Sequence, residues 1–211
     1  QLPVMYPALA AGAALSWSYD SNSSIDLSRL GKLTGLHLFD KPCPALGSAL
    51  VSLGQVHRMV VPQPPNMSAL TLHLWLPQFP VGSGLTTGLT QDDLDKIGEL
   101  IDETVNGLPD IQGDSPDHYI LDEILLGASW LKFAIRDARL RLEGDGGLPS
   151  LPEWHRTELA SDLSGILAAH RHTWLHRNRV GGLDESSAWI DHLLYCYRNG
   201  TVDPKWFGPL G

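Results

Sequence analysis

The sequence has few cysteines and no long apolar run. Cys43 and Cys196 are the two cysteines among 211 residues, too few for the disulfide framework of a small secreted domain. They could pair with each other, so the redox compartment stays open. No stretch is long and apolar enough to cross a bilayer, and we expect no membrane contact. The short apolar stretch Leu9 to Leu15 is a weak match to a secretory signal, because Arg29 is the first basic residue.

Short motifs of enzyme chemistry are also missing. The chain has no glycine-rich phosphate loop, no nucleophile elbow and no paired CxxC. Its 15 Lys and Arg residues are outnumbered by 24 Asp and Glu residues, for a formal net charge of −9, and they do not cluster apart from the acidic ones. This balance argues against nucleic acid or an anionic membrane as the main partner.

The chain does have enough apolar material for a core. Of its residues, 43% are hydrophobic, which suits one domain or one and a half. It opens at Gln1, without a methionine, and runs directly into an apolar segment. We therefore interpret the sequence as a piece of a longer protein.

The C-terminal part of the chain is predicted to be helical. Four segments repeat apolar residues three and four positions apart, as amphipathic helices do. Thr90 is expected to cap the first of them, and Ser150 and Glu153 have the spacing of a capping box for the third. A Gly181-Gly182 turn separates the third helix from the fourth. The predicted helices run from the Thr90 cap to about residue 106, from 116 to the glycines at 144–147, from the Ser150 cap to the Gly181-Gly182 turn, and from about 183 to 198. The aromatic residues Trp206 and Phe207 in the tail are expected to pack on them.

The N-terminal part is predicted to differ. Residues 10–19 form a small, apolar run that ends in an aromatic and a polar loop, which favours a buried strand. Residues 26–33 and 44–59 are expected to be helical. Residues 63–88 are rich in proline and glycine and predict a connection with one short ordered piece near 70–76.

Trp17 and Tyr19 are the candidate binding residues. They come at the end of the predicted strand and precede Asp20, Ser21 and Asn22. Two aromatic rings beside polar groups can stack on the apolar face of a sugar and bond its hydroxyls. The simpler interpretation, that Trp17 is a core residue, stays open.

The other candidate groups are weaker. His172 and His176 have the four-residue spacing of zinc ligands on a helix, but no acidic residue at a usual sequence position supports them, and a basic helix end is the simpler interpretation. The acidic pairs at 92–93 and 122–123 lie on amphipathic helices, where a solvated face is expected, and Cys196 is expected to be a buried structural thiol. We therefore expect no metal and no cofactor.

Three of the five asparagines fit the N-glycosylation pattern, namely Asn22, Asn66 and Asn199. The pattern is typical of a secreted eukaryotic chain and would carry no meaning in a bacterial one. The localisation therefore stays open.

Two segments resemble the beta-N-acetylhexosaminidase-like proteins of glycoside hydrolase family 20. Residues 174–186 read WLHRNRVGGLDES and resemble the segment WLxRNRPGGLxxS in the C-terminal helical part of that family. Residues 2–17 read LPVMYPALAAGAALSW and resemble the end of its catalytic barrel, where the last strand delivers a tryptophan to the sugar pocket. The stretches 36–40 and 50–57 fit as well. The chain departs from the family at Val180, where proline is usual, and at Tyr19, where better-known members have glutamate.

The resemblance implies a mainly α fold, with the last strand and helix of a (β/α)8 barrel followed by a helical domain of four main helices. The expected domains are residues 1–62 for the end of the barrel, 63–88 for the connection and 89–211 for the helical domain. The family hydrolyses N-acetylhexosamine-containing glycans with an Asp-Glu pair, which polarises the substrate's acetamido group and protonates the leaving oxygen. That pair would lie upstream of Gln1.

This chain alone is then expected to be inactive. It would bind carbohydrate only through the parent barrel, with Trp17 in the sugar pocket, and would pack on the upstream catalytic domain. The alternative is a free-standing helical module that binds or scaffolds other molecules without catalysis.

Overall fold

The computed structural model describes residues 5–65 and 67–206, and within these ranges its regular secondary structure is helical, without any strand. The positions 2–4 of the family resemblance, the sequon at Asn66 and the aromatic Phe207 lie outside the described residues. Within the described ranges, each helix falls short of the length and apolarity that a bilayer crossing requires.

The chain divides into two compact units, and each is built from two separate stretches of sequence. The first unit comprises Gln1–Val56 and Leu100–Ala128, and the second comprises His57–Glu99 and Ser129–Gly211. Two long helices, α6 (Gln91–Asn106) and α7 (Pro116–Leu142), contribute residues to both units. The expected boundaries near residues 62 and 88 stay a prediction.

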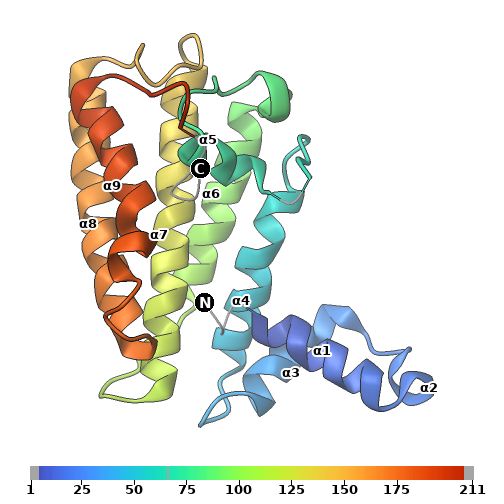
Figure 1. The fold of residues 1–211 in the computed structure, drawn as a ribbon. Coiled ribbons are helices and arrows are strands. Elements are labelled where there is room, and N and C mark those ends of the chain that lie inside the picture. The colour runs from blue at the N-terminus through green and yellow to red at the C-terminus, as the bar shows by residue number, and fades with distance from the viewer. Residues whose placement is uncertain (1–4, 66, 207–211) are drawn as a thin grey trace. The chain divides into compact units, whose positions relative to one another are not determined.

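The first unit begins with a series of short helices (Figure 1). They are α1 (Tyr6–Trp17), α2 (Tyr19–Asn22), the 3-10 turn η2 (Leu27–Arg29), α3 (Leu30–His37) and α4 (Pro44–Gln55). The predicted helix at 44–59 is confirmed by α4 and the 3-10 turn η3 (Val56–Arg58) that follows it. The short helix predicted at 26–33 appears as η2 and α3, and it continues to His37.

The predicted strand at residues 10–19 is wrong for this structure, because the segment forms the helices α1 and α2. The physical reason is local. Residues 6–17 contain five alanines and no β-branched residue, and alanine has the highest helix propensity. A strand would also need neighbouring strands to pair its backbone groups, whereas a helix pairs them within the segment.

Helices α3 and α4 pack with their backbones in close contact at three glycines. A Cβ atom on Gly47 would lie 2.2 Å from the carbonyl oxygen of Gly31, and one on Gly35 would lie 2.3 Å from the carbonyl oxygen of Cys43. Below this contact, apolar side chains of α4 and α7 form the core of the first unit. Its fully buried members are Leu46, Ala49, Leu50, Ile120, Leu121 and Ile124.

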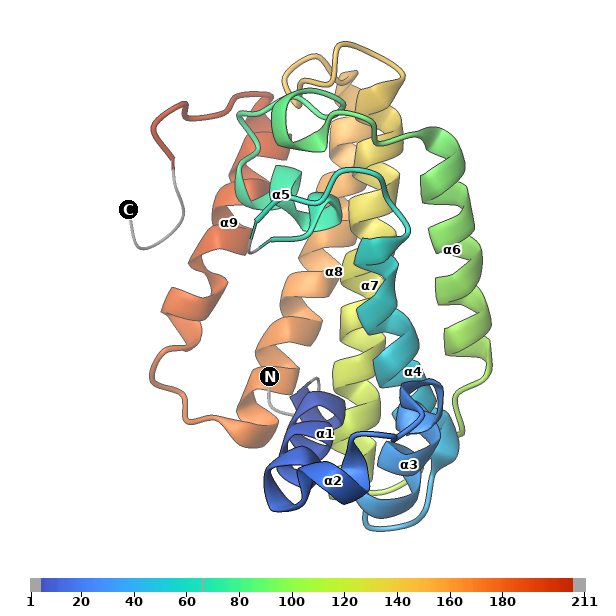
Figure 2. The same cartoon turned by 90° about the vertical axis from the view of Figure 1, so that its right-hand side faces the viewer.

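The second unit contains α5 (Ala69–Trp75), the 3-10 turn η4 (Gly84–Thr86), α8 (Glu153–Arg177) and α9 (Leu183–Asn199), together with its parts of α6 and α7. Helices α8 and α9 lie side by side, as Figures 1 and 2 both show. Helix α5 confirms the ordered piece predicted near 70–76. Trp189 of α9 stacks between Trp75 and Trp130, with ring centroids 4.9 and 4.8 Å apart.

The predicted helix ends are confirmed in part. Thr90 and Asp93 form a reciprocal capping box before α6, with N···O distances of 3.1 and 3.2 Å. The capping box predicted at Ser150 is wrong, because the Ser150 hydroxyl donates to Asp145 at 2.7 Å and Pro152 precedes α8 without a side-chain cap. In the tail, the ring of Trp206 stacks on His192 with centroids 3.8 Å apart, as expected.

Candidate functional site

The two predicted binding residues lie on the surface of the first unit. Trp17 ends α1 and is 90% exposed, and Tyr19 begins α2 and is 70% exposed. The alternative interpretation of Trp17 as a core residue is therefore wrong. Whether the two rings bind a sugar is a separate question, and it stays a prediction.

The polar residues after Trp17 hold the chain between α1 and α2. The side-chain amide of Asn22 donates to the carbonyl oxygens of Ala14 and Ser18, both at 2.9 Å, and Ser18 donates to the hydroxyl of Ser21 at 3.1 Å. Both carbonyl oxygens also accept from a backbone amide, of Ser18 and of Asn22 respectively, each at 3.1 Å, so the side-chain bonds of Asn22 reinforce the turn between α1 and α2. Asp20, which follows Tyr19 in the sequence, is exposed.

An apolar pocket of about 280 Å³ lies next to this turn in the first unit. The pocket is lined by helix α1, by the loop that follows α2, and by helix α3. Neither Trp17 nor Tyr19 belongs to the lining. Thr34 contributes a hydroxyl that is 2% exposed and has no hydrogen-bond partner among the residues described. Because a sugar carries several hydroxyl groups that need partners, this lining suits an aliphatic group better than a sugar ring.

The second unit holds a buried carboxylate that the sequence did not single out. Asp137 of α7 is 0% exposed, and three side chains surround it. The Tyr197 hydroxyl donates to Oδ1 at 2.7 Å, Arg141 donates to Oδ2 at 3.3 Å, and Nε2 of His73 lies 3.2 Å from Oδ2. One carboxylate therefore connects α5, α7 and α9.

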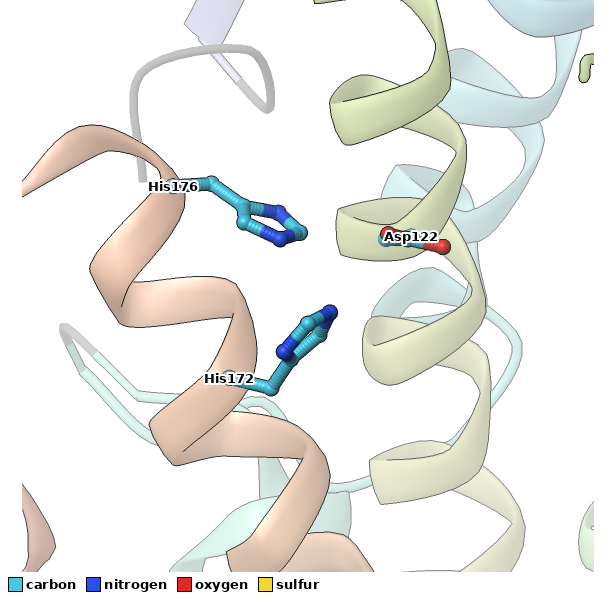
Figure 3. A group of neighbouring side chains, drawn as sticks. All are labelled: Asp122, His172 and His176. Carbon is cyan, nitrogen blue, oxygen red and sulfur yellow. The ribbon is translucent and has the colours of Figure 1, made fainter. Parts of the chain in front are cut away.

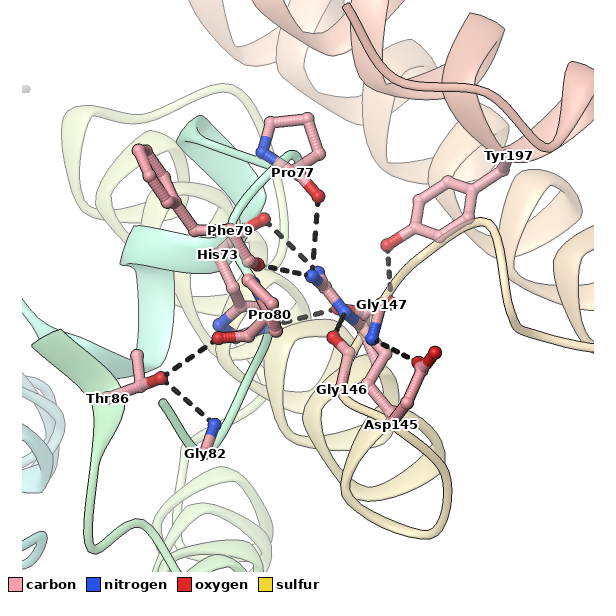
Figure 4. A network of polar contacts seen from close by, with 12 residues as sticks. His73, Pro77, Phe79, Pro80, Gly82, Thr86, Asp145, Gly146, Gly147 and Tyr197 are labelled. Carbon is pink, nitrogen blue, oxygen red and sulfur yellow. Dashed lines mark hydrogen bonds and ion pairs between the residues drawn. The ribbon is translucent and has the colours of Figure 1, made fainter. Parts of the chain in front are cut away.

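Arg141 extends this network to the loop after α5 (Figure 4). Its guanidinium donates to the carbonyl oxygens of Phe79 at 2.6 Å and of Pro77 at 3.3 Å, and to that of Gly146 at 2.8 Å. The side chain is almost completely buried. A buried arginine needs both a counter-charge and partners for its other N–H groups, and here Asp137 and the loop carbonyls supply them.

The network perturbs the titration of two of its members. Burial raises the pKa of Asp137, but the Arg141 charge and the bonds from His73 and Tyr197 outweigh burial and hold that pKa below its usual value of 3.8. Burial, together with the neighbouring Asp137 charge, raises the pKa of the Tyr197 hydroxyl well above its usual value. Asp137 therefore stays a carboxylate and Tyr197 stays a donor at neutral pH.

His172 and His176 leave α8 on the same side, with ring centroids 4.4 Å apart (Figure 3). Two imidazoles supply only half of the four ligands of a structural zinc site. Asp122, which Figure 3 also labels, lies on the part of α7 that belongs to the first unit. The pair by itself does not make a metal centre.

The remaining candidates have structural partners. Asp92 pairs with Lys96 at 2.5 Å, and Asp93 belongs to the capping box of α6. Cys196 is buried, and burial raises the pKa of its thiol to about 11. These placements confirm the structural interpretation of the 92–93 pair and of Cys196.

The sequence carries a signal for part of the buried network, the pair Asp137 and Arg141, and none for its other members. Asp137 and Arg141 are four residues apart on α7, in a helix whose apolar residues are spread over more than one face. Ionisable residues in such a helix are a signal of a buried pair, because a buried charge needs a partner. Their link to His73 and Tyr197 depends on tertiary packing and leaves no sequence pattern.

The chain was also compared with protein-family models, with curated proteins and with solved structures. No family model, curated protein or solved structure matches it.

Proposed function

We propose that the chain is the C-terminal, non-catalytic portion of a beta-N-acetylhexosaminidase-like glycoside hydrolase of family 20. The catalytic Asp-Glu pair lies upstream of Gln1 and acts with the acetamido group of the substrate. The helices of the second unit brace the catalytic domain, and Trp17 contributes to its sugar pocket.

The observation that carries this proposal is the exposure of Trp17 at the end of an apolar helix. Helix α1 buries one of its twelve residues, Pro7, although its sequence is mostly alanine, leucine and aromatic. A contiguous apolar surface of this kind marks a site that binds another surface or a ligand. An exposed indole also suits the apolar face of a sugar, and the polar residues Asp20 and Ser21 follow it closely in the sequence.

The proposal is tested on the gene and on the protein. The coding sequence upstream of Gln1 is expected to contain repeated strand-helix units and an Asp-Glu pair. Purified residues 1–211 are expected to give no turnover of an aryl N-acetylglucosaminide, and turnover by this chain alone would overturn the non-catalytic assignment.

The role of Trp17 is tested in the longer gene product. Replacement of Trp17 by alanine is expected to raise KM for the aryl glycoside by about two- to tenfold, the range that corresponds to loss of one aromatic contact. Trp154 of α8 is also exposed, so the variant Trp154→Ala is the matched control and is expected to leave KM unchanged. Equal KM values for the two variants would exclude Trp17 from the sugar pocket.

A second candidate is a free-standing helical module that binds or scaffolds without catalysis. The observation that favours it is the helical conformation of α1, because the family resemblance implies a strand there. Hydrogen exchange and a structure of the longer gene product separate the two. If the glycosidase proposal is correct, residues 10–17 of the longer gene product pair with neighbouring strands. If the chain is a free-standing module, these residues stay helical.

A further inference from the structure

A small pocket of about 150 Å³ lies beside the buried network of the second unit. It is formed by α5, by the loop that follows it and by η4. Most of its lining is apolar, from Leu72, Leu76, Phe79, Pro80 and Leu85. Phe79 and Leu85 are both exposed on their outer sides, so they border the pocket where it meets solvent.

The hydroxyl groups in the lining have partners. The Thr86 hydroxyl donates to the carbonyl oxygen of Ser83 at 2.9 Å. It also accepts from the amide of Gly82 at 3.0 Å, as Figure 4 shows. Ser83 donates to the carbonyl oxygen of Pro80 at 3.2 Å. Neither side chain therefore needs a ligand to complete its hydrogen bonds.

His73 is different. It lines the pocket and is 1% exposed, and neither of its ring nitrogens has a partner with hydrogen-bond geometry within the described ranges. Nε2 lies 3.2 Å from Oδ2 of Asp137, which leaves Nδ1 for another partner. A buried polar atom without a partner is unfavourable, and such atoms commonly mark a place where a water or a ligand binds.

The surroundings of Asp137 indicate which nitrogen carries the hydrogen. Oδ2 of Asp137 lies 3.2 Å from Nε2, and a lone pair on Nε2 would face the carboxylate charge, so the tautomer with its hydrogen on Nε2 is the favoured one. That tautomer has its hydrogen on Nε2 and a lone pair on Nδ1. The unpartnered atom is thus an acceptor, and its partner must be a donor.

We propose that this pocket is a binding site for a small apolar molecule with one hydrogen-bond donor, of the size and chemistry of phenol. The donor bonds to Nδ1 of His73, and the ring packs against the leucines and Phe79. An apolar protein cavity of 150 Å³ holds a molecule of the size of benzene, so the volume fits a single aromatic ring. This inference uses the second unit alone and does not depend on the glycosidase proposal.

The test compares phenol with toluene, which has nearly the same shape and no donor. The complete chain, with ¹⁵N-labelled histidine, is titrated with each compound and followed by NMR. Phenol is expected to give saturable shifts at the His73 ring nitrogens, with the largest change at Nδ1. Absence of saturable binding by phenol, or binding that leaves the His73 nitrogens unchanged, would overturn the proposal.

Two variants separate the hydrogen bond from the shape of the pocket. His73→Phe keeps a planar ring and removes the acceptor, so the preference for phenol over toluene is expected to fall by about two- to tenfold, the change expected for one hydrogen bond. Leu76→Trp fills the pocket and is expected to abolish binding of both compounds, whereas the control Leu175→Trp, at an exposed site on α8, is expected to leave binding intact.

An unchanged preference in His73→Phe would overturn the proposal. Should His73→Phe fail to fold, the nitrogen shifts of the unmodified chain still decide the outcome. Hydrolase assays play no part in any of these measurements, so a failure here and a failure of the proposed function can be told apart.

Discussion

Asp137 shows how much one residue can organise in the second unit. Its two oxygens accept from Tyr197 and Arg141 and face His73, so a single carboxylate ties together three helices. Removing one partner of a buried charge destabilises the protein by more than the free energy of the lost hydrogen bond, because the remaining charge is left buried without that partner. The stability of this unit should therefore be sensitive to each member of the network.

Replacement of Tyr197 by phenylalanine tests this sensitivity with the smallest change. The variant removes the hydroxyl that donates to Asp137 at 2.7 Å and keeps the buried ring. We expect the free energy of unfolding, measured with urea, to fall by about 1–3 kcal/mol, the range for a buried hydrogen bond to a charged group. Tyr195 lies two residues away on the exposed face of α9, and Tyr195→Phe is expected to change stability little. Equal stability of the two variants would contradict this role of the hydroxyl.

The lowered pKa of Asp137 gives a prediction for pH. Its pKa in the folded protein lies below 3.8, so the carboxylate contributes stability that is complete above the unfolded pKa near 4 and is lost as the pH falls through the folded value. We expect the free energy of unfolding to decrease as the pH falls through the acid window below about pH 4. The slope over this window should be smaller in Asp137→Asn than in the unmodified chain.

Asp26 provides the control for that measurement. Its pKa is also lowered, by hydrogen bonds from the hydroxyl and amide of Ser28, but the carboxyl is fully exposed. Solvent screens such groups, and their pairing contributes little to stability. Asp26→Asn is therefore expected to retain the slope of the unmodified chain. A slope in Asp137→Asn that equals the slope in Asp26→Asn would show that Asp137 is not the group responsible.

At the scale of elements, the sequence predicted the long helices well and the first element poorly. Helices α6 and α7 carry long apolar repeats with clear starts, at Thr90 and at Pro116, and both were located correctly. The run at residues 10–19 is short and apolar without a period, so periodicity did not separate a strand from a helix, and its aromatic end and polar loop favoured the strand. Its alanine content then favours a helix when the chain offers no strand to pair with.

The close contact of α3 and α4 gives the prediction at this scale. In Gly47→Ala the new Cβ would lie 2.2 Å from the Gly31 carbonyl oxygen and 2.3 Å from the Gly35 amide nitrogen, both rigid backbone atoms. The helices must move apart, and we expect a loss of about 1–3 kcal/mol in the free energy of unfolding. Gly54 lies on the same helix with nothing within 4 Å of its Cβ position, so Gly54→Ala is expected to stabilise the chain slightly through helix propensity. A Gly47→Ala variant as stable as Gly54→Ala would contradict the packing described for α3 and α4.

At the scale of the whole molecule, neither compact unit is a continuous piece of chain. The backbone passes between the units after Val56, within α6 and within α7. Where the chain passes from one unit to the other within α6 and within α7, its backbone is continuous helix rather than a loop. Domains that fold independently are usually joined by exposed linkers rather than by continuous helices. The sequence pattern of α6 and α7 predicted their continuity but not the division that passes through them, because that division depends on which side chains pack together.

This continuity leads to a prediction about cooperativity. The chain has seven tryptophans, and all except Trp17 belong to the second unit, so tryptophan fluorescence reports mainly on that unit while far-UV circular dichroism reports on both. Because α6 and α7 carry one hydrogen-bond ladder through both units, we expect the two probes to give the same unfolding midpoint in guanidinium. Gly47→Ala, which changes the first unit, should lower the fluorescence midpoint together with the dichroism midpoint. Two separate transitions, with the fluorescence midpoint unchanged in Gly47→Ala, would show that the second unit unfolds independently of the first.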